Sequence, residues 1–202
     1  RDRSIKALID NADCSHKARF TLIDADGNEK ASTIADLRPI ISAKLPVEDP
    51  VLWNGRKNPY LYTVRCEIFD STTQEVTDNI DIRTGLREYH IDSHKGFFLN
   101  GEHIKLQGVS RHQDRENMGN AITEKQHAED VKIILDVGAN SVRLAHYQQN
   151  SYFYDLCDES GLLVWAEVPV ISRFSPKRNE NAEQQLVELI KQNYNHPSIF
   201  CW

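Results

Sequence analysis

The chain has 202 residues, a net charge of −6 and an ordinary balance of 40% hydrophobic and 27% charged residues. This length is enough for one large or two ordinary domains. The acidic balance, without a basic run, argues against a nucleic-acid partner, because binding to phosphates requires a cationic face. No stretch approaches the roughly 18 consecutive apolar residues of a membrane span, and no signal peptide is visible at the start. We therefore expect neither a nucleic-acid nor a membrane partner.

The cysteines lie far apart and form no Cys-x-x-Cys pair. They are Cys14, Cys66, Cys157 and Cys201. A zinc site needs closely spaced ligands, and a disulfide framework is typical of much shorter chains. The spacing therefore predicts reduced thiols and neither a zinc site nor a disulfide.

Residues 1–86 carry the pattern of short strands and show no helical periodicity. Apolar or alternating runs cover residues 4–10, 17–24, 38–46, 60–70 and 75–83. Asp26-Gly27 follows one such run and predicts a tight hairpin turn with a positive φ at one or both central residues. Short strands punctuated by Asp, Gly and Pro indicate a small antiparallel β-sandwich.

Residues 87–202 follow a different pattern, in which strands and helices alternate after a small hairpin around Asn100-Gly101. Apolar strands are expected at residues 104–110, 140–145, 162–168 and 198–202, and helices at 123–138, 150–161 and 181–195. Thr123 caps the first helix, and Gly138 and Gly161 end the first two. Repeated βα units build a parallel sheet, either an open doubly wound sheet or a (β/α)8 barrel. No glycine-rich phosphate loop follows a strand, so a dinucleotide fold has little support.

Polar side chains gather where these strands end. The first strand ends in Ser110, Arg111, His112, Asp114 and Arg115, the second in Arg143, His146 and Tyr147, and the third in Glu167. In parallel barrels the chemistry lies at the carboxyl ends of strands, so we expect a pocket there for a polyhydroxylated or anionic ligand. Because side chains alternate along a strand, Arg143 and His146 share a pocket only if the strand ends or bulges before His146. Taken singly, His146 also suits a packing role, and Glu167 suits an ion pair with a helix lysine.

Residues 138–165 resemble the first signature of glycoside hydrolase family 2. That signature runs from Asn and Arg through two small residues to His-Tyr-Pro, and then to apolar residues, an Asp, a Gly and an apolar run. The matching positions are Asn140, Arg143, His146, Tyr147, Phe153, Tyr154, Asp158, Gly161 and 162–165. Two positions depart from it, since Leu144 replaces a small residue and Gln148 replaces the proline. Residues 195–202 resemble the opening of the second signature, residues 97–114 the entry into the barrel, and residues 50–70 the end of the family's immunoglobulin-like domain.

The resemblance implies a multidomain fold, β followed by α/β. Residues 1–86 would form an immunoglobulin-like β-sandwich, and residues 87–202 the N-terminal half of a (β/α)8 TIM barrel. It implies a fragment of a retaining exo-β-glycosidase, most similar to the bacterial β-galactosidases in its "SRHQDR", "LAHYQQ" and "AEVPVIS" segments. β-Glucuronidase and β-mannosidase of the same family stay open as alternatives, as does a non-catalytic carbohydrate-binding protein.

The resemblance also implies which residues bind the substrate. The corresponding family residues belong to the sugar pocket, which assigns substrate binding to His112, Arg143 and His146. The acid/base and nucleophilic glutamates of the family would follow Trp202, so no catalytic residue is expected within the chain. Since Trp202 ends an apolar strand, we expect the chain to be a piece of a longer protein.

The same resemblance bears on cofactors, partners and location. The magnesium ligands of some members do not carry over, because Ile171 and Arg173 stand where a Glu and a His are expected. No metal and no other cofactor is expected, and the partner is a carbohydrate. Open strand edges would allow self-association into a homo-oligomer. The bacterial periplasm and cytoplasm are both compatible with the sequence.

Overall fold

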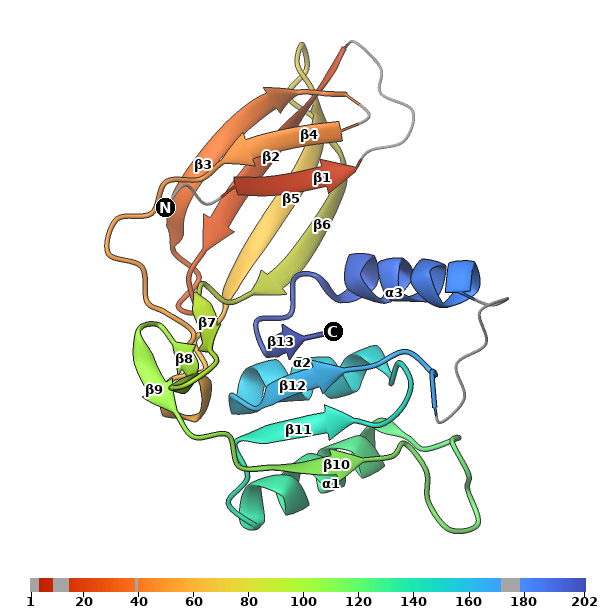
Figure 1. The fold of residues 1–202 in the computed structure, drawn as a ribbon. Coiled ribbons are helices and arrows are strands. Elements are labelled where there is room, and N and C mark those ends of the chain that lie inside the picture. Colours follow the sequence, from red (N-terminus) through yellow and green to blue (C-terminus); the bar gives the residue numbers. More distant parts are fainter. Residues whose placement is uncertain (1–3, 9–14, 39, 172–178) are drawn as a thin grey trace. The chain divides into compact units, whose positions relative to one another are not determined.

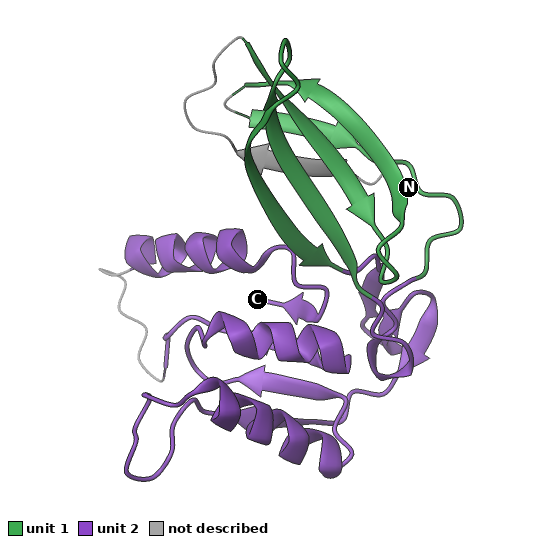
Figure 2. Ribbon diagram, turned by 180° about the vertical axis from the view of Figure 1, so that it is seen from behind, with its two compact units in different colours: residues 1–51, 61–84 green, residues 52–60, 85–202 purple. Residues whose placement is uncertain are grey.

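The computed structural model describes residues 4–8, 15–38, 40–171 and 179–202 (Figure 1). The chain divides into two compact units, one formed by residues 1–51 and 61–84 and the other by residues 52–60 and 85–202 (Figure 2). Residues 52–60 therefore belong with the second unit, although two strands of the first unit follow them in the sequence. No helix within the described ranges is long and apolar enough to cross a lipid bilayer.

The first unit is built from antiparallel strands. A four-stranded sheet has the order β3-β2-β5-β6, and β1 pairs with β4 in a two-stranded sheet. The strands are β1 (Ser4–Leu8), β2 (His16–Ile23), β3 (Glu29–Asp36), β4 (Ile40–Lys44), β5 (Tyr62–Asp70) and β6 (Val76–Thr84). Alternate side chains of β2, namely Ala18, Phe20 and Leu22, are buried, as are Tyr62 and Val64 of β5. One face of the larger sheet thus forms the core, which is the pattern expected of a sandwich.

The hairpin between β2 and β3 confirms the turn predicted at Asp26-Gly27. Gly27 has a φ of 85°. The Asp24 carboxylate accepts hydrogen bonds from the backbone amides of Asn28 and Asp26, at 2.8 and 3.0 Å. A short acidic side chain that satisfies the turn's own amides explains why this segment reverses rather than continuing as a strand.

The second unit begins with a three-stranded antiparallel sheet and continues as a parallel βα array. The antiparallel strands are β7 (Tyr89–Asp92), β8 (Gly96–Leu99) and β9 (Glu102–Ile104). Asn100 and Gly101 have φ values of 50° and 84°, which confirms the predicted hairpin. The parallel strands are β10 (Gly108–Arg111), β11 (Ser141–Leu144), β12 (Leu163–Ala166) and β13 (Ile199–Cys201), adjacent in that order.

Three helices connect the successive parallel strands (Figure 1). They are α1 (Glu124–Asp136), α2 (Ser151–Ser160) and α3 (Asn179–Asn193). Thr123 and Gln126 form a reciprocal capping box at the start of α1, and the Asn150 side chain accepts from the amide of Tyr152 at the start of α2. Consecutive βα units in sequential order are the arrangement expected for the first half of a TIM barrel.

The register of the parallel sheet decides which side chains face the helices. Val142 and Leu144 of β11 and Val164 of β12 are buried against apolar side chains of all three helices. Arg143 stands between the first two, and it aligns across the sheet with Ser110 and Trp165. Because side chains alternate, this row points to the opposite face. The arginine inside an apolar strand is thereby kept out of the helix-covered core.

The end of α2 depends on a glycine that closes against another backbone. Gly161 has a φ of 71°, and a Cβ at this position would lie 2.2 Å from the carbonyl oxygen of Gly55. Gly138, after α1, has a φ of 80°, but a Cβ there would have nothing within 4 Å. The two glycines have similar backbone conformations and differ in their surroundings.

We therefore predict that Gly161→Ala destabilises the protein far more than Gly138→Ala. Both changes incur the left-handed backbone cost of roughly 1–2 kcal/mol. Only the change at Gly161 also forces two backbones apart, which adds overpacking of roughly 1–3 kcal/mol or more. Thermal unfolding of the two variants measures the difference. Equal losses in melting temperature would show that the close approach of Gly161 and Gly55 does not constrain this helix end.

Candidate functional site

The centre of the site is an ion pair between Arg143 in β11 and Glu167, which follows β12. Arg143 Nε donates to Glu167 Oε1, and Arg143 Nη2 donates to Oε2 over 3.1 Å. The Glu167 side chain is 16% exposed. Burial alone would raise the pKa of Glu167, but hydrogen bonds from Arg143 and His146 outweigh it and leave the pKa below its ordinary value of 4.5. The carboxylate is therefore ionised at neutral pH.

His146 joins this pair from beyond the end of β11. Its Nδ1 lies 3.1 Å from Glu167 Oε2 and 3.2 Å from Arg143 Nη2. A guanidinium only donates and a carboxylate only accepts, so a protonated Nδ1 donates to Glu167. This arrangement leaves Nε2, on the far edge of the ring, to bind another group.

The parity argument from the sequence is confirmed. The strand ends at Leu144, and Ala145 and His146 follow it, so alternation no longer separates Arg143 from His146. The peptide bond between Ala145 and His146 is cis. Glu167, for which a helix lysine was an alternative partner, pairs with Arg143 and His146.

His112 follows β10 and lies next to His146. The two rings are edge-on, with centroids 5.5 Å apart and an interplanar angle of 74°. The ring of Tyr147 lies 5.9 Å from His112, and its hydroxyl accepts from the amide of Gln113 at 2.9 Å. The structure thus brings His112, Arg143 and His146 together at the carboxyl ends of two neighbouring parallel strands.

Two arginines that the sequence analysis places at this rim lie elsewhere, so that expectation is wrong. Arg111 aligns with Leu144, is 6% exposed and binds Asp130 of α1 at 2.7 Å. Arg115 binds Glu129 and Asp130 of the same helix. Strand parity explains the first case, because Arg111 is one residue past Ser110, which shares the row of Arg143.

Trp165 belongs to the cluster, although the sequence analysis does not single it out. It is 43% exposed, and its ring centroid lies 5.2 Å from Cζ of Arg143. An exposed indole beside polar groups offers a flat apolar surface together with a hydrogen-bonding site. The signal available in the sequence was its position two residues before Glu167, which places both on the same face of β12 if the alternation continues.

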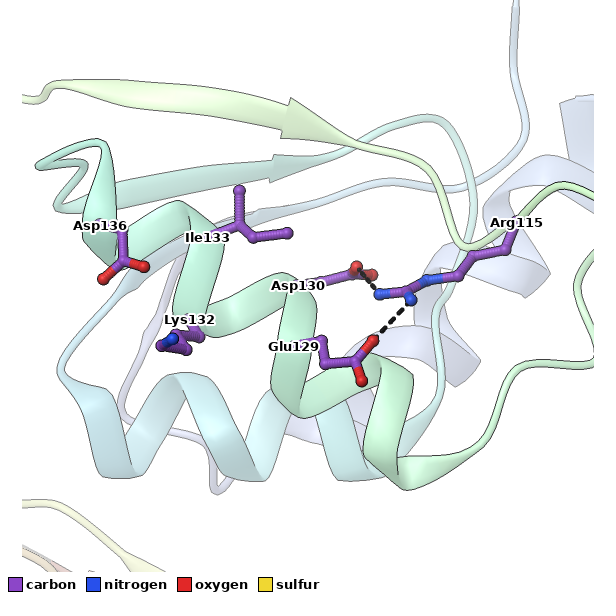
Figure 3. Close-up of a pocket in the computed structure, with 6 residues that line it drawn as sticks. All are labelled: Arg115, Glu129, Asp130, Lys132, Ile133 and Asp136. Carbon is purple, nitrogen blue, oxygen red and sulfur yellow. Dashed lines mark hydrogen bonds and ion pairs between the residues drawn. The ribbon is translucent and has the colours of Figure 1, made fainter.

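A separate surface hollow of about 490 Å³ lies along α1 (Figure 3). It is lined by Arg115, Glu129, Asp130, Lys132, Ile133 and Asp136. Arg115 spans Glu129 and Asp130 with ion pairs of 2.6 and 2.7 Å. Three charged side chains of the hollow therefore bind one another. The lining of the hollow includes none of the residues predicted to bind substrate.

Within the part of the chain that the structure describes, one cluster has metal-ligand chemistry. Asp155, Asp158 and His196 place one ligand atom each within 4.8 Å of one another. Asp158 is already engaged, because its Oδ2 lies 2.6 Å from His196 Nδ1 and its Oδ1 accepts from the amide of Ser198. These contacts join the end of α2 to the segment before β13, which is a structural task.

The thiols of the described residues are free at Cys66, Cys157 and Cys201. Burial raises the pKa of the Cys157 thiol well above its usual value, so this group stays protonated and unreactive. Cys14 and Arg173, which the sequence analysis also considered, lie outside the described residues.

Comparison with known proteins gives one family over both units. The family model described as "Glycosyl hydrolases family 2, TIM barrel domain" matches residues 91–202, and the model "Glycosyl hydrolases family 2" matches residues 3–87. A β-glucuronidase of Bacteroides fragilis is 45% identical over 167 residues, covering 78% of this chain and 24% of that protein. A β-galactosidase of Thermoanaerobacter pseudethanolicus is 33% identical over 205 residues, covering 98% of this chain and 27% of that protein.

The fold is also similar to solved structures. The crystal structure of a putative β-galactosidase from Bacteroides fragilis superimposes with a TM-score of 0.89 at 40% identity, covering 98% of this chain and 30% of that chain. The chain spans about a quarter of the length of the curated relatives it matches.

The ion pair at the centre of the site leads to a prediction about pH. Glu167→Gln should lower stability at pH 7 by roughly 1–3 kcal/mol, because the Arg143 and His146 donors lose a charged acceptor. The folded-state pKa of Glu167 is lowered, so its stabilisation is complete above the unfolded pKa and is lost as pH falls through the folded pKa. Urea unfolding from pH 7 down to pH 3 should therefore show the parent and the variant converging below about pH 4.5.

The matched control is Asp81→Asn, which breaks the exposed pair between Asp81 and Arg65. Exposed pairs contribute little, so this variant should remain close to the parent at every pH. A Glu167→Gln deficit that stays constant down to pH 3 would contradict the assignment of an ionised, paired carboxylate.

Proposed function

Because this chain belongs to glycosyl hydrolase family 2, we propose that it forms one wall of the sugar pocket in an enzyme that hydrolyses terminal β-glycosides. The observation that supports this most directly is the meeting of His112, Arg143 and His146 at the carboxyl ends of β10 and β11. Their parallel strands end side by side, which is where barrel enzymes place their chemistry.

In this proposal the three residues bind hydroxyl groups of the terminal sugar. A hydroxyl both donates and accepts, so it suits an imidazole nitrogen in either role and the donors of a guanidinium. Glu167 holds Nδ1 of His146, so His146 offers Nε2 to the substrate. Trp165 adds a flat apolar surface against which a sugar ring can rest.

The bond-breaking groups lie outside this set. A retaining glycosidase needs two carboxyl groups about 5–5.5 Å apart, one as acid/base and one as nucleophile. Glu167 is bound to Arg143 and His146, and its lowered pKa makes it a poor proton donor. We assign binding and orientation to this chain's residues, and neither chemical step to them.

For the sugar itself, a β-galactosyl group is the first candidate. Three arginines lie at the end of β10, after it and in β11, and each already has a carboxylate partner. The partners are Asp130 for Arg111, Glu129 and Asp130 for Arg115, and Glu167 for Arg143. A neutral sugar needs no further cation from these residues. A β-glucuronyl group is the second candidate, because the relative that is 45% identical is a β-glucuronidase.

A panel of nitrophenyl β-glycosides tests the proposal on the protein that carries these residues. Hydrolysis of the β-D-galactoside above all others supports the first candidate, and a preference for the β-D-glucuronide supports the second. Failure to hydrolyse any β-glycoside, by folded protein, would contradict the proposed function.

We predict that His146→Phe lowers kcat/KM while leaving the fold intact. A hydrogen bond to the sugar that charge developing in the transition state strengthens contributes roughly 1.5–3 kcal/mol, so the loss should be about 10- to 150-fold. The control is His94→Phe in the exposed turn between β7 and β8, which should keep the parent's kinetics. An unchanged kcat/KM in folded His146→Phe protein would remove this residue from the sugar pocket.

A further inference from the structure

A buried hydrogen-bond network surrounds the side chain of Arg111, the residue that precedes His112. Arg111 donates from Nε and Nη2 to Asp130 Oδ2 at 3.0 and 2.7 Å, and from Nη1 to Gln149 Oε1. Its Nη2 also lies 3.0 Å from His127 Nδ1. Arg111, His127 and Gln149 are 6%, 1% and 3% exposed. A buried guanidinium is tolerated only with such full pairing.

This network is joined to the backbone immediately before each histidine. The carbonyl oxygen of Arg111, one residue before His112, accepts from the amide of Ala145 at 3.1 Å. Ala145 is one residue before His146. The same carbonyl accepts from Gln149 Nε2 at 3.1 Å. Gln149 therefore accepts a hydrogen bond from the side chain of Arg111 and donates one to its backbone carbonyl. These bonds link the segment that follows β10 to the segment that follows β11.

A second set of bonds joins the same segments beyond the histidines. The amide of Gln113 donates to the Tyr147 hydroxyl at 2.9 Å, and the amide of Asn150 donates to Gln113 Oε1 at 2.7 Å. Hydrogen bonds thus join the two segments both before and after the histidines. Of these two sets, the one before the histidines includes the buried Arg111, which pairs with Asp130 of α1.

We propose that Arg111 and Gln149 are positioning residues that set the spacing of the His112 and His146 rings for the sugar. This inference rests on the proposed function. Stability alone does not explain the network, because apolar residues of similar size often stabilise a buried site as well or better. What the network adds is a fixed link from α1, through Arg111 and Gln149, to the backbone beside both rings. Such placement matters because a shift of about 1 Å can cost on the order of 100-fold in rate.

The experiment compares Gln149→Asn with Gln148→Asn in the protein that carries these residues. The first change withdraws the amide from Arg111 by one methylene group and keeps its polarity. The second makes the identical change at the neighbouring residue, whose side chain is exposed and binds Gln192. We expect Gln149→Asn to lower kcat at least tenfold, with a smaller change in KM, and to lower the melting temperature, because the buried Arg111 guanidinium loses one acceptor. Gln148→Asn should keep the parent's values.

A structural readout separates this inference from the proposed function. Crystal structures of the parent and of Gln149→Asn should show the His112 and His146 rings displaced from their 5.5 Å separation. If Gln149→Asn does not fold, Gln149→Glu replaces it, since a glutamate keeps the acceptor for Arg111, loses the donor to the Arg111 carbonyl and turns a charged oxygen toward that carbonyl. Unchanged kcat, KM and ring separation would overturn the proposal. A parent that hydrolyses no β-glycoside would defeat the proposed function, and the ring separation would still decide the positioning role.

Discussion

The site depends on one interaction, the ion pair between Arg143 and Glu167. An arginine inside an apolar strand is unfavourable unless it faces away from the core and finds a partner. The register of β11 turns Arg143 to the face opposite the helices, and Glu167, at the end of the next strand, supplies the carboxylate. That carboxylate also holds His146, so the orientation of the imidazole follows from the pairing of the arginine.

A second arginine, on the opposite face of the sheet, also pairs with a carboxylate at a strand end. Arg111 lies one residue past the row of Arg143 and is therefore turned toward the helices, where Asp130 of α1 pairs with it. The carboxyl ends of β10 and β11 are thus held from both faces of the sheet, by Glu167 on one and Asp130 on the other. His112 follows the first of these ends directly, and His146 follows the second after Ala145. The helix layer and the open face contribute jointly to the geometry of the candidate site.

Elements that depend on local chemistry could be predicted from the sequence. The turn at Gly27, the capping box at Thr123 and the end of α2 at Gly161 are specified by residues within a few positions of each other. The meeting of Arg143 with His146 could also be predicted from the signature, on the condition that the strand ends before His146. The destinations of Arg111 and Arg115 could not, because their partners on α1 are fixed only when the helix packs on the sheet. The contact between Trp165 and Arg143 likewise exists only through the register of β12 against β11.

The central claim is that Glu167 acts on the substrate through His146. A double-mutant cycle on kcat/KM, with Glu167→Gln, His146→Phe and the double variant, measures that coupling directly. If Glu167 serves to orient His146, its loss should cost much less in the His146→Phe background than in the parent, and any remaining loss reports its ion pair with Arg143. Fully additive losses, with the double variant reduced by the product of the two single effects, would contradict the account.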